Sequence, residues 1–471
     1  MSNVLGYDQV AVFADAKAAD YAALSDRIWD MPELAFEEFR SVAEHIEIME
    51  KEGFHITRNI AGIETAFIAE WGQAGPVIGF LGEFDALAGL SQDADTLEAA
   101  TATPGANGHG CHHNLLGAAS LLAAVALRDA VAAAGVQAKI RYYGCPAEEE
   151  GSGKTFMARA GAFDDLDAAF CWHPASFNAV MSSSTLAVVD VNARFTGRSA
   201  HAAMAPHVGR SALDAVELMN VGINYMREHM PSDARIHYAI TDAGGKAANV
   251  VQARAEGTYV IRAPELSELT TLLKRVEKIA QGAALMTETT VETTVGSAMA
   301  NIVPNRTLES AMYQNLKRCG PPPYDAEDFA YADRMRQSAL SEEDIIASAK
   351  SFGGDPDFPR SLHDDILPFP ETPGLLFGST DVGDVSWIAP TAQCLMATVA
   401  IGTPFHAWQT VAQGKRPAAH KAMIVAAKVM AATGADVISD PAMLKQAKDE
   451  LKKRTRGQDY LTLIPESLRS Q

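Results

Sequence analysis

The sequence predicts an α/β protein of two domains, in which a small α+β domain of the ferredoxin-like kind is inserted into a larger α/β domain. Three observations predict this fold. Apolar strands alternate with amphipathic helices up to about Ala187, as in α/β folds. A strand–helix–strand–strand–helix–strand order follows, and the α/β pattern then resumes. We expect residues 1–187 and 304–471 to form the discontinuous domain and residues 188–303 the inserted one.

The first part of the chain alternates between helical and strand patterns. Helices are expected over residues 15–30, 37–52 and 115–134, and strands over residues 76–83, 138–144 and 166–172. Asn114 is expected to cap the third helix. Each strand is followed by Asp, Glu or His, and open α/β sheets hold their ligands at the carboxyl ends of their strands. We therefore expect these polar side chains to face one site.

The second part contains the inserted pattern and the return to the larger domain. Strands are expected over residues 189–195, 236–240, 250–262 and 289–295, with helices over residues 211–228 and 266–286. The Pro- and acid-rich residues 319–373 predict an insertion of loops with a helix around residues 341–351. A strand over residues 393–400 and a helix over residues 418–432 complete the pattern.

Composition agrees with an enzyme that acts on small molecules. The 471 residues are 48% hydrophobic, and 39 basic against 59 acidic residues give a net charge of −20. This charge disfavours nucleic acid and anionic membranes as partners. The five cysteines show no disulfide pattern, and we find no leader in which basic residues precede an apolar stretch. We also expect no membrane-spanning segment, because the most apolar stretch, residues 115–127, is too short. These observations predict a cytoplasmic protein.

Two short stretches carry the chemistry. Residues 108–114 contain one thiol and three imidazoles, and residues 148–150 are three consecutive glutamates. Sulfur, nitrogen and oxygen ligands together are typical of a divalent transition-metal site. A carboxylate left off the metal is a base for activating water beside it. Cys111 alone would most simply be a small buried residue, but its three histidine neighbours favour a ligand.

These motifs occur in an order that resembles the M20 metallopeptidase/amidohydrolase family, subfamily D. The ordered set is Glu-Phe-Asp85, His109-Gly-Cys111-His-His113, Pro-Ala-Glu148-Glu149, His173, Gly-Arg-Ser-Ala-His201 and His406. Asn249-Val-Val-Gln, Ile261-Arg262-Ala-Pro and Asp381-Val-Gly-Asp384 are most similar to the p-aminobenzoyl-glutamate hydrolases within it. The resemblance covers nearly the whole chain. It implies a zinc-peptidase-like α/β/α catalytic domain with a lid and dimerisation domain.

The resemblance also implies a set of site residues. Two divalent ions, Mn or Zn, would be held by Cys111, His113, Glu149, His173 and His406. Glu148 would be general base and acid, and Asp85 would orient an imidazole. His201 would stabilise the oxyanion, often from a neighbouring subunit. Asn249 and Arg262 would hold a substrate carboxylate, with a surface salt bridge as the alternative for Arg262. His112 and Asn114 stand where members usually have Gly and Asp.

The expected function is hydrolysis of the amide in an N-acyl or N-aroyl amino acid, with a p-aminobenzoyl-glutamate-like substrate favoured. An N-acyl-amino-acid or indole-acetyl-amino-acid hydrolase is the alternative within the family. A non-catalytic metal-dependent binding protein is the alternative of another class, and the Glu148–Glu149 pair disfavours it. A hydrolase that uses Cys111 as its nucleophile is a third alternative. A homodimer or a pairing with a second kind of subunit is expected. The roles of His109 and His112 stay open.

Overall fold

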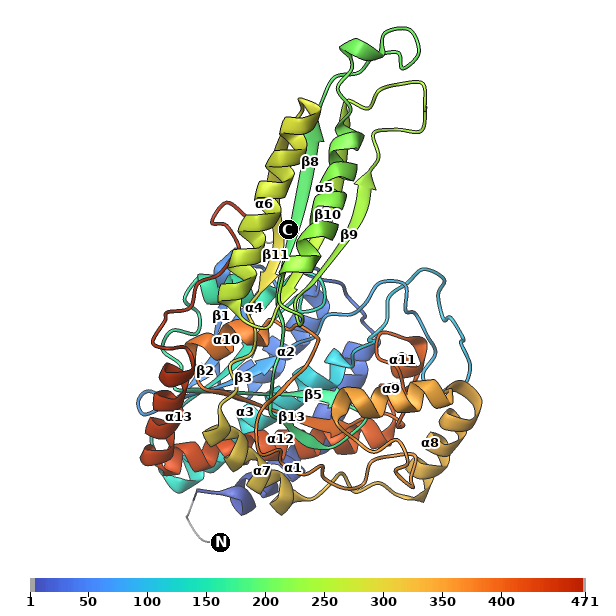
Figure 1. Cartoon of the computed structure of the whole chain (residues 1–471). Helices are drawn as coiled ribbons and strands as arrows, with labels where there is room; N and C mark the ends of the chain where they lie inside the picture. Colours follow the sequence, from blue (N-terminus) through green and yellow to red (C-terminus); the bar gives the residue numbers. More distant parts are fainter. Residues whose placement is uncertain (1–4, 469–471) are drawn as a thin grey trace.

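The computed structural model describes residues 5–468, and its largest sheet has seven strands in the order β1-β2-β4-β3-β5-β13-β6 (Figure 1). The strands are β1 (His55–Arg58), β2 (Phe67–Trp71), β3 (Val77–Gly82), β4 (Lys139–Gly144), β5 (Ala168–Ala175), β6 (Ala179–Met181) and β13 (Thr391–Ala397). The four central strands β4, β3, β5 and β13 are parallel. Their carboxyl ends therefore meet at one edge, as the polar residues after them predicted.

The central strands are buried on both faces, which explains their continuous apolar pattern. All six residues of β3 are buried, as expected for a parallel strand covered by helices on either side. Strands β1 and β2 were not predicted, and β1 is mostly exposed and four residues long, so it carries no apolar run. Strand β5 continues to Ala175. His173 therefore lies inside the strand, and its predicted position at the strand end is wrong.

Long helices cover one face of this sheet. They are α1 (Tyr7–Trp29), α2 (Phe39–Lys51), α3 (His113–Ala134), α7 (Arg306–Cys319) and α12 (Pro417–Ser439). Helices α3 and α12 are long and apolar enough to cross a membrane. The expectation that no apolar stretch, including residues 115–127, reaches that length is therefore wrong. Their most apolar stretches are 83% and 78% buried within the protein. They are the central helices of the core, where alanine allows close packing.

Asn114 does not cap α3. The helix begins at His113, two residues before the predicted start at Leu115, and it follows His112, whose φ of 61° is in the left-handed region. Asn114 lies inside the first turn, and its Nδ2 donates to Ser25 Oγ on α1 at 2.9 Å. The predicted cap is therefore a contact between two helices, because the turn at His112 starts the helix without a side-chain cap.

The inserted segment forms a second, four-stranded sheet with the order β11-β8-β10-β9, which rises from the body of the molecule (Figure 1). Its elements are β8 (Ala187–Thr196), α5 (Ala212–Met226), β9 (Arg235–Asp242), β10 (Arg254–Ala263), α6 (Leu266–Thr287) and β11 (Thr290–Met299). All neighbouring strands are antiparallel. The order and pairing confirm the ferredoxin-like pattern, and α5 and α6 bury one face of this sheet.

The remaining elements surround the larger sheet, except for the turns Pro206–Val208 and Arg227–His229, which lie within the inserted segment. They are α4 (Gly153–Arg159), α8 (Ala326–Ala339), α9 (Glu342–Phe352), α10 (Val382–Ile388), α11 (Trp408–Gln413), α13 (Pro441–Arg454), the short strands β7 (Ser183–Ser184) and β12 (Gly374–Leu375), and single turns over Ile60–Gly62, Pro206–Val208 and Arg227–His229. Helix α9 confirms the helix expected near residue 341. Helix α8 was missed because its sequence has little apolar periodicity; Asp325 and Asp328 form a capping box that begins it.

A close contact at the junction of the two sheets gives a stability prediction. Gly383 in α10 lies against the segment after β11, and a Cβ there would overlap the carbonyl oxygen of Ala300. We expect Gly383→Ala to lower the free energy of unfolding by about 1–3 kcal/mol through this overpacking, measured by chemical denaturation. Gly282→Ala in α6 is the control, since a Cβ there meets nothing within 4 Å. Equal stability of the two variants would contradict the prediction.

Candidate metal centre

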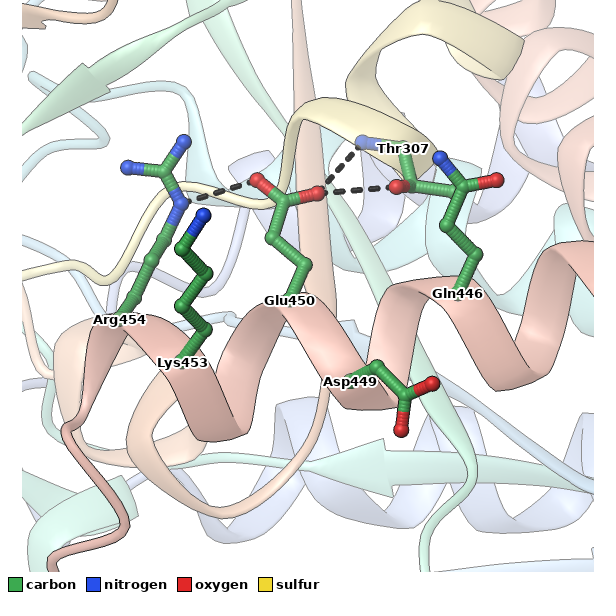
Figure 2. Close-up of a pocket in the computed structure, with 6 residues that line it drawn as sticks. All are labelled: Thr307, Gln446, Asp449, Glu450, Lys453 and Arg454. Carbon is green, nitrogen blue, oxygen red and sulfur yellow. Dashed lines mark hydrogen bonds and ion pairs between the residues drawn. The ribbon is translucent and has the colours of Figure 1, made fainter.

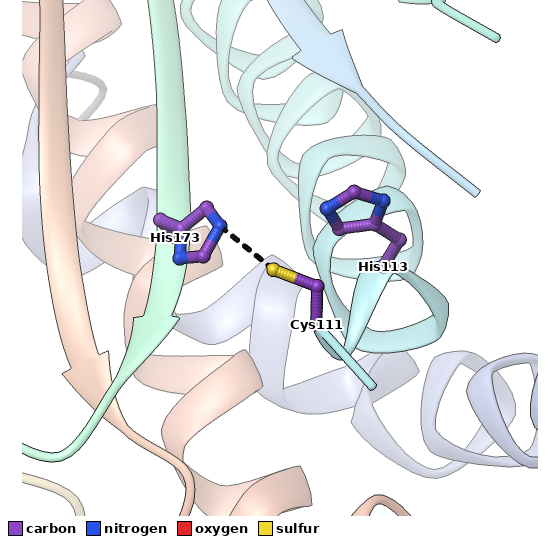
Figure 3. A group of neighbouring side chains, drawn as sticks. All are labelled: Cys111, His113 and His173. Carbon is purple, nitrogen blue, oxygen red and sulfur yellow. Dashed lines mark hydrogen bonds between the residues drawn. The ribbon is translucent and has the colours of Figure 1, made fainter. Parts of the chain in front are cut away.

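One cluster at the sheet edge joins a thiol and two imidazoles (Figure 3). Cys111 lies two residues before the start of α3, His113 is the first residue of α3, and His173 projects from β5. Cys111 Sγ lies 3.4 Å from His173 Nε2. The ligand atoms of the three residues all lie within 4.8 Å of one another. These residues could therefore share a metal ion.

A second group shares Cys111 with Glu149 and His406. His406 Nε2 lies 3.3 Å from Glu149 Oε2, and Glu149 Oε1 lies 4.0 Å from His113 Nε2. Glu149 therefore stands between the two groups. His406 is the exposed member, at 54% of its side chain, and its backbone N–H donates to the carbonyl of Gly110 at 2.9 Å. This bond holds the His406 loop against the loop that carries Cys111.

The donor atoms of these groups fit a divalent cation. His113 Nε2 and Glu149 Oε1 are buried without a hydrogen-bond partner among the described residues, and such atoms are rare unless something binds them. Burial raises the pKa of the Cys111 thiol, with the charge of Glu149 adding to the effect, so a thiolate there needs a cation beside it. The mixture of sulfur, nitrogen and oxygen suits a transition metal.

Asp85 contacts two of the candidate ligands. Its Oδ1 accepts a hydrogen bond from His113 Nδ1 at 2.8 Å, and its Oδ2 accepts one from the backbone N–H of Glu149 at 2.9 Å. The first bond leaves His113 Nε2 free to face the centre. His173 is fixed in the same way, because its Nδ1 donates to the carbonyl of Pro174 at 2.7 Å. Both rings thus turn Nε2 toward the centre.

A third group contains a residue that was not predicted from the sequence. Glu83 joins His113 and Glu148, with its Oε2 3.3 Å from His113 Nε2. Glu83 and Asp85 are two residues apart just after β3, and that spacing could have placed both on the same side. Burial and the charges of Glu83 and Asp381 raise the pKa of Glu148 well above its usual value.

The other two histidines of the motif are bound by the protein itself. His109 Nε2 donates to the carbonyl of Ile28 at 3.0 Å, and His112 Nε2 donates to the carbonyl of Thr410 at 2.6 Å. Burial lowers the pKa of His109 to about 4 and that of His112 to about 3. Both rings are therefore neutral, and they join the Cys111 loop to α1 and α11.

The three predicted residues of the inserted segment lie at its two ends. His201 and Asn249 are exposed in loops beyond β8 and β9, where the backbone N–H of Ala202 donates to the carbonyl of Asn249. These loops form the far tip in Figure 1. Arg262 lies at the near end and donates to Ser379 Oγ at 2.9 Å. The ten residues of β8 run from the near end of the inserted segment to its tip. At about 3.3 Å per residue, the tip and the near end are therefore roughly 30 Å apart.

His201 has a defined ring orientation at this tip. Its Nδ1 accepts hydrogen bonds from the backbone N–H groups of Ala203 and Met204, both at 3.2 Å. The proton is then on Nε2, which is left as a donor. Arg262 forms no ion pair with a carboxylate among residues 5–468, so the salt bridge considered for it is absent there.

A surface pocket of about 620 Å³ lies elsewhere, between α7 and α13 (Figure 2). Its central carboxylate, Glu450, accepts from the backbone N–H and the hydroxyl of Thr307 and from Arg454 Nε. The carboxylate is therefore satisfied by the protein and fastens the two helices together. The pocket contains none of the candidate ligands.

The sequence of this chain is similar to a family model and to proteins of known class. The M20 model described as "Peptidase dimerisation domain" matches residues 186–288. The chain is 46% identical to a p-aminobenzoyl-glutamate hydrolase subunit of Escherichia coli (strain K12), over 99% of each chain. It is 32% identical to Xaa-Arg dipeptidase of Mus musculus, over 95% of this chain and 92% of that one. The chain belongs to the M20 peptidase family.

A solved M20 structure has the same fold. The dinuclear metal binding peptidase from the M20 family of Bacillus subtilis superposes with a TM-score of 0.60 at 17% identity, covering 90% of this chain and 99% of that one. The expected architecture, a catalytic domain with an inserted dimerisation domain, is confirmed. Membership of the family also confirms the expected class of enzyme, a hydrolase of amide bonds.

Proposed function

We propose that this M20 enzyme uses two divalent metal ions to cleave the amide of an N-acyl or N-aroyl amino acid. The observation that carries the proposal is the convergence of Cys111, His113, Glu149, His173 and His406 in two groups that share the Cys111 thiol. The relative from Escherichia coli is named for p-aminobenzoyl-glutamate. A substrate of this kind, with an aryl acyl group and an acidic amino acid, is therefore our first choice.

The metal ions would be held by these five side chains, with Asp85 orienting His113 and positioning Glu149. When bound, Mn²⁺ or Zn²⁺ supplies the Lewis acidity that lowers the pKa of water and polarises the scissile carbonyl. Sulfur favours Zn²⁺ on grounds of softness, whereas three imidazoles and a carboxylate are compatible with either ion.

Glu148 would perform the proton transfers. Its carboxyl group is beside His113 but outside the group formed by Cys111, Glu149 and His406, so it is available as a base. It would accept a proton from the attacking water as the C–O bond forms. It would then deliver this proton to the amine nitrogen as the C–N bond breaks.

The inserted domain would complete the site from a second subunit. His201 Nε2 is an exposed donor suited to an oxyanion, but it lies at the far tip of its own chain, together with Asn249. Arg262 lies at the near end, close to the catalytic domain. We infer that His201 and Asn249 act across a dimer and that Arg262, with its planar fork of donors, binds the substrate carboxylate.

A dimer formed through residues 186–288 would supply this second subunit. The Escherichia coli relative is named as one of two different subunits of its hydrolase, which also supports a pairing with a different chain. A cytoplasmic location is our inference from the cysteines, which are all free in the structure, four of them buried.

The alternatives can be separated with a panel of substrates. Purified protein would be assayed with Mn²⁺ and with Zn²⁺ on p-aminobenzoyl-glutamate, indole-acetyl-aspartate and N-acetyl amino acids, following release of the free amino acid. Fastest release of glutamate from p-aminobenzoyl-glutamate supports the first choice. Preference for the other amides selects the alternative hydrolase, and binding without any product selects a binding protein.

Removal of the metal gives a separate prediction. We expect dialysis against a chelator to abolish hydrolysis and added Mn²⁺ or Zn²⁺ to restore it, because without a cation nothing stabilises the Cys111 thiolate or activates water. Metal content would be measured by mass spectrometry alongside the rate. A nucleophilic cysteine hydrolase predicts the opposite: full activity in chelator, and loss only when Cys111 is alkylated.

A further inference from the structure

Lys154 is the one buried lysine among residues 5–468, and its side chain is fully inaccessible to solvent. It is the second residue of α4, the helix that directly follows the loop carrying Glu148 and Glu149. Its Nζ lies 2.6 Å from Glu83 Oε1 and 2.6 Å from Asp381 Oδ1. Burial would lower the pKa of Lys154, but Asp381 and Glu83 raise it well above its usual value. The group is therefore a cation.

Stability alone is a weak reason for such an arrangement. Removing an ammonium group and two carboxylates from water costs several kcal/mol for each ion, and apolar side chains of similar volume often replace buried ion pairs without loss of stability. A buried network of this kind does, however, fix the positions of its members. Lys154 therefore acts through the groups that it holds in place.

On one side Lys154 holds a carboxylate that faces the candidate metal centre. It binds Glu83 through Oε1, so that the other oxygen, Oε2, points to His113 Nε2 at 3.3 Å. This nitrogen has no hydrogen-bond partner among the described residues. Glu83 also lies in the same group as Glu148. Without Lys154, the Glu83 carboxylate would be free to rotate, and its charge would no longer be balanced beside Glu148.

On the other side Lys154 is tied to the junction with the inserted domain. Asp381 precedes α10 and also accepts a hydrogen bond from the backbone N–H of Lys154 at 2.9 Å. The hydroxyl oxygen of the neighbouring Thr155 lies 3.0 Å from a carboxylate oxygen of Asp384 in α10 and 3.0 Å from the carbonyl oxygen of Ala298 in β11, and its single proton hydrogen-bonds at this junction. Helix α4 is thus held by α10 and by the end of the last strand of the inserted domain.

From this geometry we propose that Lys154 is a positioning residue of the active site, which acts through Glu83 on the metal centre and on Glu148. The inference rests on the proposed metal-dependent hydrolysis. It assigns Glu83 a place at the edge of the centre, with one oxygen facing the ions and the other held by Lys154. It also makes Asp381 the group that connects this arrangement to the domain junction.

The test is a double-mutant cycle on the Mn²⁺-loaded enzyme. The variants are Lys154→Met, Glu83→Gln and the two combined. For each we would measure Mn²⁺ retention against a competing chelator, kcat, KM and the midpoint of thermal unfolding. We expect each single variant to bind Mn²⁺ about 10–100-fold more weakly, as changes to groups behind metal ligands do, with kcat lowered and KM little changed.

The combined variant distinguishes positioning from structural support. Because Lys154 acts through Glu83, we expect the double variant to retain Mn²⁺ no worse than Glu83→Gln alone, so that the two effects are not additive. The double variant also removes one positive and one negative charge together. Its Mn²⁺ affinity can therefore still be compared with that of Glu83→Gln if Lys154→Met alone does not fold. Fully additive losses of Mn²⁺ affinity would overturn the proposal, as would unchanged affinity and kcat in Glu83→Gln.

A matched control is available on α12. Lys421 Nζ also lies 2.6 Å from two carboxylates, those of Asp325 and Asp328, but it contacts none of the residues of the candidate centre. We expect Lys421→Met to retain Mn²⁺ and turn over substrate at the wild-type level. If the wild-type enzyme shows no hydrolysis with either Mn²⁺ or Zn²⁺, the proposed function fails. If the wild type is active and Lys154→Met equals it in affinity and kcat, only the role of Lys154 fails.

Discussion

Glu148→Gln is expected to abolish amide hydrolysis while the protein keeps its metal. The amide of glutamine cannot accept the proton of water or return it to the leaving amine, and loss of a general acid–base typically costs about 10²–10⁴-fold in rate. The five candidate ligands are unchanged in this variant, so metal content measured by mass spectrometry should match the wild type. The rate would be followed as glutamate released from p-aminobenzoyl-glutamate.

The adjacent glutamate supplies the control for this substitution. Glu150 is exposed and lies in none of the metal-capable groups. Glu150→Gln removes the same charge from the same loop, and we expect it to hydrolyse substrate at the wild-type rate. Wild-type turnover by Glu148→Gln would show that another group transfers the proton. Loss of metal from Glu148→Gln would instead move Glu148 into the ligand set.

Substitution of His201, at the far tip of the inserted domain, is expected to cause the second large loss of activity. Loss of one oxyanion donor typically lowers kcat about 10²–10³-fold, and we expect this from His201→Ala with metal content unchanged. Action across a dimer has a stricter consequence. Mixed with Glu148→Gln, an inactive His201→Ala subunit should recover activity, because one of the two sites then combines an intact Glu148 with an intact His201.

This complementation has a calculable size. Random pairing of equal amounts of the two variants makes half of the dimers mixed, each with one intact site, so about a quarter of the wild-type activity should return. Asn249→Ala in place of His201→Ala should behave in the same way, because both residues lie at the tip. Mixed dimers, purified with two different tags, that are as inactive as their parents would place His201 in the site of its own subunit.

The sequence predicted the parts of this molecule that repeat or punctuate a pattern. The buried parallel strands and the ferredoxin-like order were recognisable because apolar runs have a fixed length and period. The Cys111 and Glu148–Glu149 motifs were recognisable because few other chemistries need those atoms together. Helices α8 and α13 and strand β1 were missed, since exposed or weakly amphipathic segments leave little signal.

The buried network around Lys154 was missed for a different reason. Glu83, Lys154 and Asp381 are separated by 71 residues in one step and 227 in the next, and nothing local marks them as partners. A lysine near the start of a helix most simply points to solvent. Only the fold shows that this one is enclosed, just as only the fold shows that Asn114 bonds to α1 instead of capping its own helix.

The separation of His201 from Arg262 along the length of β8 has a consequence for how the enzyme would respond to its own abundance. A lone subunit would carry parts of two different active sites and a complete copy of neither. Specific activity would then fall on dilution, as dimers dissociate, although every chain stays folded. A cell could regulate such an enzyme through its concentration alone, without an inhibitor and without covalent modification.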